Sequence, residues 1–106
     1  MNRAEVDLAL EIEADFAIIC KGDGMINARI FDGDVVYIRQ QDTVENGEIA
    51  AVLIDGEASL MRVYTFENRI CLAYENPKYR TVVLREEEMN KVCILGKAVA
   101  FTGTVI

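Results

Sequence analysis

The chain has 106 residues, of which 52% are hydrophobic and 27% charged, so it fits one modest globular domain over residues 1–106 and not a disordered segment. Its 11 Lys and Arg against 18 Asp and Glu give a net charge of −7. Without a basic cluster, such a chain is poorly suited to bind DNA phosphates itself. Apolar runs such as residues 16–20 are far too short for a transmembrane helix, so no membrane partner is expected.

Histidine is absent, which excludes Ser-His-Asp and Cys-His catalysis and every zinc site that needs imidazole. Three cysteines, Cys20, Cys71 and Cys93, are odd in number and lack CxxC spacing. Neither a disulfide framework nor a metal site is therefore indicated, and no cofactor is expected. We expect the three thiols to be reduced, as small core hydrophobes of a cytoplasmic protein; a reactive thiol is the alternative.

Strand patterns and turn residues alternate along the chain. Gly22-Asp23-Gly24 ends the first apolar stretch, and Asp32-Gly33-Asp34 and Asn46-Gly47 mark further turns. Asp55-Gly56 lies between two apolar runs, which is a strong hairpin signal. The pattern predicts strands over residues 16–20, 35–38, 48–54, 58–64, 69–74, 81–84 and 92–101.

Helix is scarce in this sequence. Residues 1–13 fit a period of 2 better than 3.6, and residues 25–30 fit a single helical turn. Glu86-Glu87-Glu88 fits a solvated loop or a helix start, and Gly96 predicts a bulge or bend within the last strand. Short strands separated by turns predict a mainly β domain with mostly antiparallel pairing.

A family resemblance rests on several ordered blocks. The stretch from Cys20 to Ala28, with Asp32-Gly33-Asp34 after it, resembles the active-site segment of LexA-like domains, the C-terminal domains of LexA, lambda-type phage repressors and UmuD (peptidase family S24). Asp32 follows Gly24 by eight positions, as the Asp-Gly-Asp turn follows the serine in that family. The resemblance covers about residues 15–101 and implies the LexA/signal-peptidase-like fold of bent antiparallel sheets. The later matching blocks are Asn46-Gly47, Asp55-Gly56, Leu60-Met61-Arg62-Val63, Glu75-Asn76-Pro77 and Gly96-Lys97-Ala98-Val99.

The catalytic positions of that family are both substituted here. In the family a serine is the nucleophile, and a neutral lysine amine 37 positions later takes its proton. Gly24 stands at the serine position and Met61, 37 positions later, at the lysine position. The backbone N–H groups of Asp23 and Gly24 correspond to the oxyanion hole. The domain is therefore predicted to be inactive as written.

No substitute for the dyad is visible in the sequence. Ser59 is the only serine and lies two residues from Met61, and nothing pairs Lys21 with a nucleophile. The Ala-Gly or Cys-Gly pair that such proteins cleave is also absent, so the chain corresponds to the core that remains after the cleavage region. If Gly24 and Met61 lie in one cleft, restoring serine and lysine together should restore cleavage.

The resemblance implies a regulatory and dimerisation domain of a phage-type or SOS-type repressor. DNA would be contacted only by an N-terminal domain that this chain lacks. LexA-like domains form two-fold dimers, and an apolar edge strand must be covered, so we expect a homodimer through the last strand. Two alternatives stay open: an active self-cleaving peptidase whose dyad was removed by mutation, and a free-standing interaction module of the UmuD type. The predicted dimer-strand residues are Val92, Ile94, Val99 and Phe101.

Overall fold

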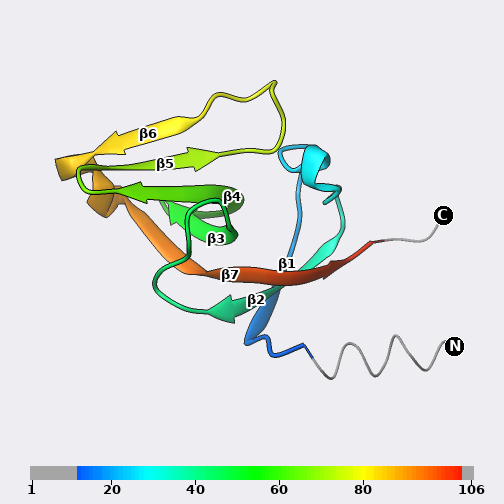
Figure 1. The fold of residues 1–106 in the computed structure, drawn as a ribbon. Helices are drawn as coiled ribbons and strands as arrows, with labels where there is room; N and C mark the ends of the chain where they lie inside the picture. Colours follow the sequence, from blue (N-terminus) through cyan, green and yellow to red (C-terminus); the bar gives the residue numbers. More distant parts are fainter. Residues whose placement is uncertain (1–11, 104–106) are drawn as a thin grey trace, which may run out of the picture.

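The computed structural model describes residues 12–103 (Figure 1). Every predicted strand is present, with each end within two residues of its expected place, and short 3-10 helices occupy the two segments expected to form a helical turn or a helix start. Most of residues 1–13 lie outside the described residues. The elements are β1 (Phe16–Ile19), η1 (Ile26–Ala28), β2 (Val35–Gln40), β3 (Ile49–Ile54), β4 (Glu57–Phe66), β5 (Arg69–Ala73), β6 (Val82–Arg85), η2 (Glu86–Lys91) and β7 (Val92–Thr102).

The described strands form one seven-stranded sheet in the order β1-β2-β7-β3-β4-β5-β6, and every neighbouring pair is antiparallel. This confirms the predicted mainly β fold. The β3–β4 hairpin turns at Asp55 and Gly56, whose φ values of 51° and 82° are both positive. A turn with two positive φ angles matches the twist of the flanking strands, and Asp-Gly readily adopts such a turn. This is why the Asp-Gly pair predicted the hairpin correctly.

The last strand is not at an edge of the sheet, so our reason for placing the dimer there was wrong. β7 lies between β2 and β3, and the edge strands are β1 and β6 (Figure 1). Residues 92–97 of β7 pair with β3, whereas residues 96–102 pair with β2. Outside residues 96 and 97, each half of β7 therefore has one strand partner among the described residues. β7 joins two half-sheets, one formed by β1 and β2 and the other by β3 to β6.

The crossover between the half-sheets requires a glycine. A Cβ atom at Gly96 would lie 2.3 Å from the carbonyl oxygen of Arg39 and 2.6 Å from Cγ2 of Ile38. Register shifts occur on both sides of it, between Ala51 and Val52 in β3 and between Tyr37 and Ile38 in β2. The expected bend at this glycine is thus a close approach of three strands.

Alternation along β3 and β4 divides the core into two clusters. Ala51 and Leu60 belong to one cluster, which also holds Cys20, Met25, Ile30, Val36 and Ile38. Their neighbours belong to the other, which consists of Ala50, Val52, Met61, Val63, Ile70 and Leu72. Because successive strand residues point to opposite faces, the two clusters lie on opposite sides of these strands. Val92 and Ile94 of β7 pack on the second cluster and Leu95 on the first.

The cysteines divide by burial. All three are free, as expected. Cys20 is buried in the core, and burial, with Asp34 and Asp32 nearby, raises the pKa of its thiol. Cys93 is exposed, so our expectation of a core position was wrong for this residue. It sits on the outer face of β7, next to Val92 and Ile94 that point inward.

Within residues 12–103, no helix has the length and apolar character needed to traverse a lipid bilayer.

Candidate functional site

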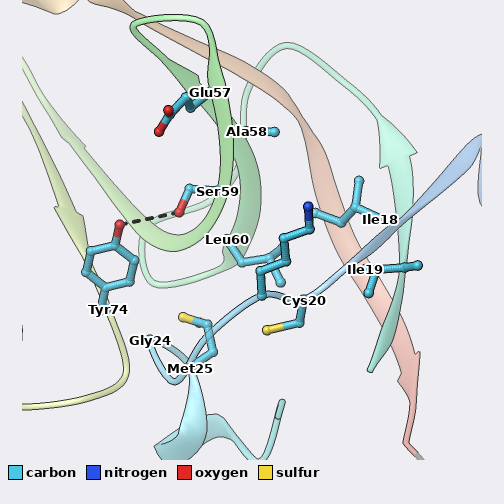
Figure 2. Close-up of a pocket in the computed structure, with 11 residues that line it drawn as sticks. Ile18, Ile19, Cys20, Gly24, Met25, Glu57, Ala58, Ser59, Leu60 and Tyr74 are labelled. Carbon is cyan, nitrogen blue, oxygen red and sulfur yellow. Dashed lines mark hydrogen bonds between the residues drawn. The ribbon is translucent and has the colours of Figure 1, made fainter. Parts of the chain in front are cut away.

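A groove of about 570 Å³ lies between β1 and the β3–β4 hairpin (Figure 2). Its two walls come from the two half-sheets, since β1 and the segment after it form one side and the start of β4 forms the other. The lining residues are Ile18, Ile19, Cys20, Lys21, Gly24, Met25, Glu57, Ala58, Ser59, Leu60 and Tyr74. The groove therefore contains Gly24, the residue that the family resemblance predicts to stand at the serine position.

The loop that carries Gly24 is fixed by the Asp-Gly-Asp turn. The N–H of Gly22 donates a 2.7 Å hydrogen bond to Oδ1 of Asp32, and the N–H of Gly33 donates to the carbonyl of Cys20 at 2.8 Å. Buried Asp34 accepts a hydrogen bond from the N–H of Phe31 at 2.8 Å. Backbone and carboxylate hydrogen bonds thus hold the two glycine-containing turns against each other.

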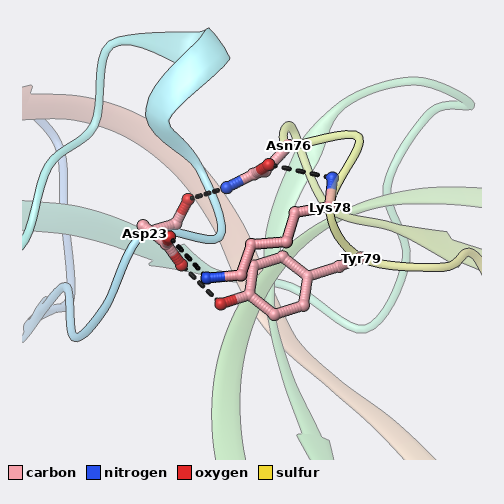
Figure 3. A network of polar contacts seen from close by, with 4 residues as sticks. All are labelled: Asp23, Asn76, Lys78 and Tyr79. Carbon is pink, nitrogen blue, oxygen red and sulfur yellow. Dashed lines mark hydrogen bonds and ion pairs between the residues drawn. The ribbon is translucent and has the colours of Figure 1, made fainter.

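A second set of contacts ties Asp23 to the loop between β5 and β6 (Figure 3). The Asp23 carboxylate accepts a hydrogen bond from the Tyr79 hydroxyl and pairs with the Lys78 ammonium at 3.3 Å. The amide of Asn76 donates to the carbonyl oxygen of Asp23 at 2.8 Å. The hydrogen bond from Tyr79 is the largest effect and lowers the pKa of Asp23; burial opposes it, and the hydrogen bond and positive charge of Lys78 lower the pKa further. Asp23, the first expected oxyanion position, is therefore anchored to a distant loop.

Met61, which the family resemblance predicts to stand at the lysine position, lies in β4 opposite Ala50 and is fully buried in the second core cluster. It does not line the groove. A thioether in this apolar environment has no proton-accepting amine, so nothing at position 61 can act as a general base. That Gly24 and Met61 lie side by side stays a prediction.

Ser59 and Tyr74 face each other in the groove. The Ser59 Oγ lies 3.4 Å from the Tyr74 hydroxyl, with either group able to donate the proton (Figure 2). Tyr74 follows directly after β5 and had not been singled out in the sequence. Tyr74 lies fifty positions after Gly24 in the sequence. No local sequence pattern indicates that an aromatic residue at the end of a strand contributes to the same groove as a residue so far away.

The four predicted dimer-strand residues differ in exposure. Val92 and Ile94, in the first half of β7, are partly buried against the second cluster. Val99 and Phe101, in the second half, line a shallow groove of about 290 Å³, and Phe101 is 42% exposed. Only the second half of the strand thus offers apolar surface beside a groove.

Residues 12–103 contain no cluster of three or more Cys, Asp or Glu side chains that could hold a metal ion.

Comparison with known proteins shows the family of this chain. Residues 4–99 match the family described as Peptidase S24-like. The chain is 41% identical over 90 residues to the LexA repressor of Geobacter metallireducens, and 43% identical over 88 residues to that of Magnetococcus marinus. These alignments cover 85% and 83% of this chain but only 44% and 37% of the two relatives. The chain thus spans less than half the length of the relatives it matches.

Proposed function

Because the chain belongs to the peptidase S24-like family, we propose that it is the regulatory domain of a phage-type or SOS-type transcriptional repressor that does not cleave itself. The observation that carries this proposal is the pair of substituted positions, Gly24 in the groove and fully buried Met61 in β4. The relatives are named LexA repressors, which supports the repressor assignment.

Peptide cleavage by a serine–lysine dyad needs two groups at once. A hydroxyl must attack the peptide carbonyl while a neutral amine accepts its proton. Glycine at position 24 provides no hydroxyl, and the thioether of Met61 accepts no proton at neutral pH. The groove therefore contains neither reacting group at these two positions.

The test is incubation of the purified chain with a peptide containing a family-type Ala-Gly cleavage segment, from pH 7 to pH 10. Alkaline pH is the most permissive condition, because a lysine base would be neutral there. We expect no cleavage product by mass spectrometry. Ser59→Ala and Lys21→Ala variants are run in parallel, since both side chains line the groove. A product that disappears in either variant would reveal a different dyad and overturn the proposal.

DNA contact would belong to a separate domain of the full-length protein in the cytoplasm. The net charge of −7 supports this division, because an acidic domain is repelled by the phosphate backbone. The full-length reading frame tests it: a helix-turn-helix segment upstream is expected for a repressor, whereas its absence would favour an interaction module of the UmuD type.

We also propose that the domain forms a two-fold dimer through the second half of β7. Residues 98–102 have β2 on one side, and the groove that contains Phe101 lies beside them. An antiparallel contact between two copies of this segment would cover both the apolar surface and the backbone edge that no strand within residues 12–103 pairs with. This reason replaces the edge-strand argument, which the position of β7 excludes.

A further inference from the structure

Gly24 has no room for a side chain. A Cβ atom built on this residue would lie 2.8 Å from Cδ1 and 3.2 Å from Cε1 of Tyr74. Optimal separations between non-bonded carbon atoms are about 3.5–4.0 Å, so the ring would have to move to admit even a methyl group. Gly24 is not among the residues with positive φ, so the constraint is space and not backbone conformation. The missing side chain at position 24 is thus matched by the ring of Tyr74.

The ring of Tyr74 is held from several directions. It packs against both core clusters, and its centroid lies 5.2 Å from that of Tyr79. Its hydroxyl lies 3.4 Å from Ser59 Oγ, and the next residue, Glu75, accepts a 2.8 Å backbone hydrogen bond from Asn27. Because Cδ1 belongs to the ring and not to a flexible side-chain end, these contacts resist its displacement.

We propose that Tyr74 contributes to the inactivity of the site, in addition to Gly24 and Met61. Its ring occupies the space that the side chain of a nucleophile at position 24 needs. This inference rests on the proposed function, since it concerns the same groove. Serine at position 24 and lysine at position 61 would then not suffice for activity, because the serine Cβ meets the ring. Reactivation requires a third change, at Tyr74.

The inference is tested by a double-mutant cycle in the full chain. Gly24→Ala is combined with Tyr74→Val, which keeps side-chain atoms only as far as the γ position. At that position the tyrosine Cγ lies 3.7 Å from the built Cβ, an ordinary contact. With Tyr74 in place, Gly24→Ala should lower the Tm by about 4 °C or more, as overpacking does. In the Tyr74→Val background the same change should leave the Tm unchanged or raise it, since alanine restricts the unfolded chain.

Two controls isolate the ring. Tyr74→Phe keeps the ring and removes the hydroxyl, so Gly24→Ala should remain as costly as in the natural chain. Gly22→Ala, in the same loop, has φ +83° and nothing within 4 Å of its Cβ position, so its cost comes from backbone strain. That cost should be the same whichever residue stands at position 74.

Equal Tm losses for Gly24→Ala in the tyrosine and valine backgrounds would overturn the inference, as would no loss with Tyr74 present. If Tyr74→Val does not fold, Tyr74→Thr replaces it, because threonine also has no side-chain atoms beyond the γ position. The proposed function fails on a different result, namely cleavage by the natural chain. The two proposals can therefore be separated.

Discussion

The hydroxyl of Tyr79 donates a hydrogen bond of 2.5 Å to Oδ1 of Asp23, a residue 56 positions earlier in the chain (Figure 3). Lys78 and Asn76 bind the same aspartate, so one short loop after β5 fixes the residue that precedes Gly24. The groove is thus assembled from parts that only the tertiary structure brings together.

Tyr79→Phe should lower the urea midpoint of unfolding at pH 7, and this loss should shrink as the pH falls below 3.8. The folded state holds the pKa of Asp23 below its ordinary value of 3.8, chiefly through the Tyr79 hydroxyl. That stabilisation is present above 3.8 and is lost as the pH falls through the lowered value. Tyr64→Phe is the control, because Tyr64 makes none of the contacts to Asp23. Its effect on the urea midpoint should not depend on pH in this way. A pH-independent effect of Tyr79→Phe would contradict this account.

Tyr79 should ionise late in an alkaline titration followed by ultraviolet absorbance. The hydrogen bond to Asp23, then burial and the charge of Asp23, raise the pKa of its phenol above 10.0. Since the folded value is raised, this contribution to stability is complete below pH 10 and is lost as the pH rises through the raised value. Asp23→Asn removes the negative charge and should return one of the four tyrosines to an ordinary titration.

Met61→Lys should destabilise the domain at pH 7 by about 1–3 kcal/mol, because it places an amine in a fully buried apolar cluster. Burial lowers the pKa of such an amine below its value in the unfolded chain. The cost should therefore shrink as the pH rises toward about 10, where the unfolded chain loses the same proton. Urea denaturation at pH 7 and pH 10 measures this. Met61→Leu, of similar volume, should cost less than about 1.5 kcal/mol at both.

Gly24→Ser with Met61→Lys should give no cleavage of the Ala-Gly peptide, whereas adding Tyr74→Val should give measurable cleavage. The steric conflict at position 24 is relieved only in the triple variant. A dyad acts as a unit, so neither single substitution should be active in any background. Mass spectrometry of the peptide is the readout, and cleavage by the double variant at the triple variant's rate would show that the ring moves aside freely.

Phe101→Glu should weaken dimerisation at least about tenfold in Kd, which corresponds to about 1.4 kcal/mol. Phe101 is 42% exposed beside the groove of the second half of β7. Phe66→Glu is the matched control, since Phe66 is 40% exposed but lies at the far end of β4. Sedimentation equilibrium provides the measurement. A natural chain that stays monomeric at high micromolar concentration would end the dimer proposal.

The sequence predicted the turns and the strand positions, because these depend on residues that are neighbours in the chain. Asp55-Gly56 located a hairpin because both residues adopt the left-handed conformation, and apolar alternation located the strands to within two positions. Sequence neighbours carry no information on strand order, so the central place of β7 was missed. The contact between Gly24 and Tyr74 was missed for the same reason, since fifty positions separate the two residues. The family blocks predict the substituted positions Gly24 and Met61, but they give no sign of the ring that lies against Gly24.

The bend of β7 at Gly96 determines how the two half-sheets are oriented relative to each other. The two half-sheets meet at residues 96 and 97 of β7, and the groove containing Gly24 has one wall on each half-sheet. A change in the bend of β7 at these residues would alter the angle between the two half-sheets. It would therefore change the width of the groove that lies between them.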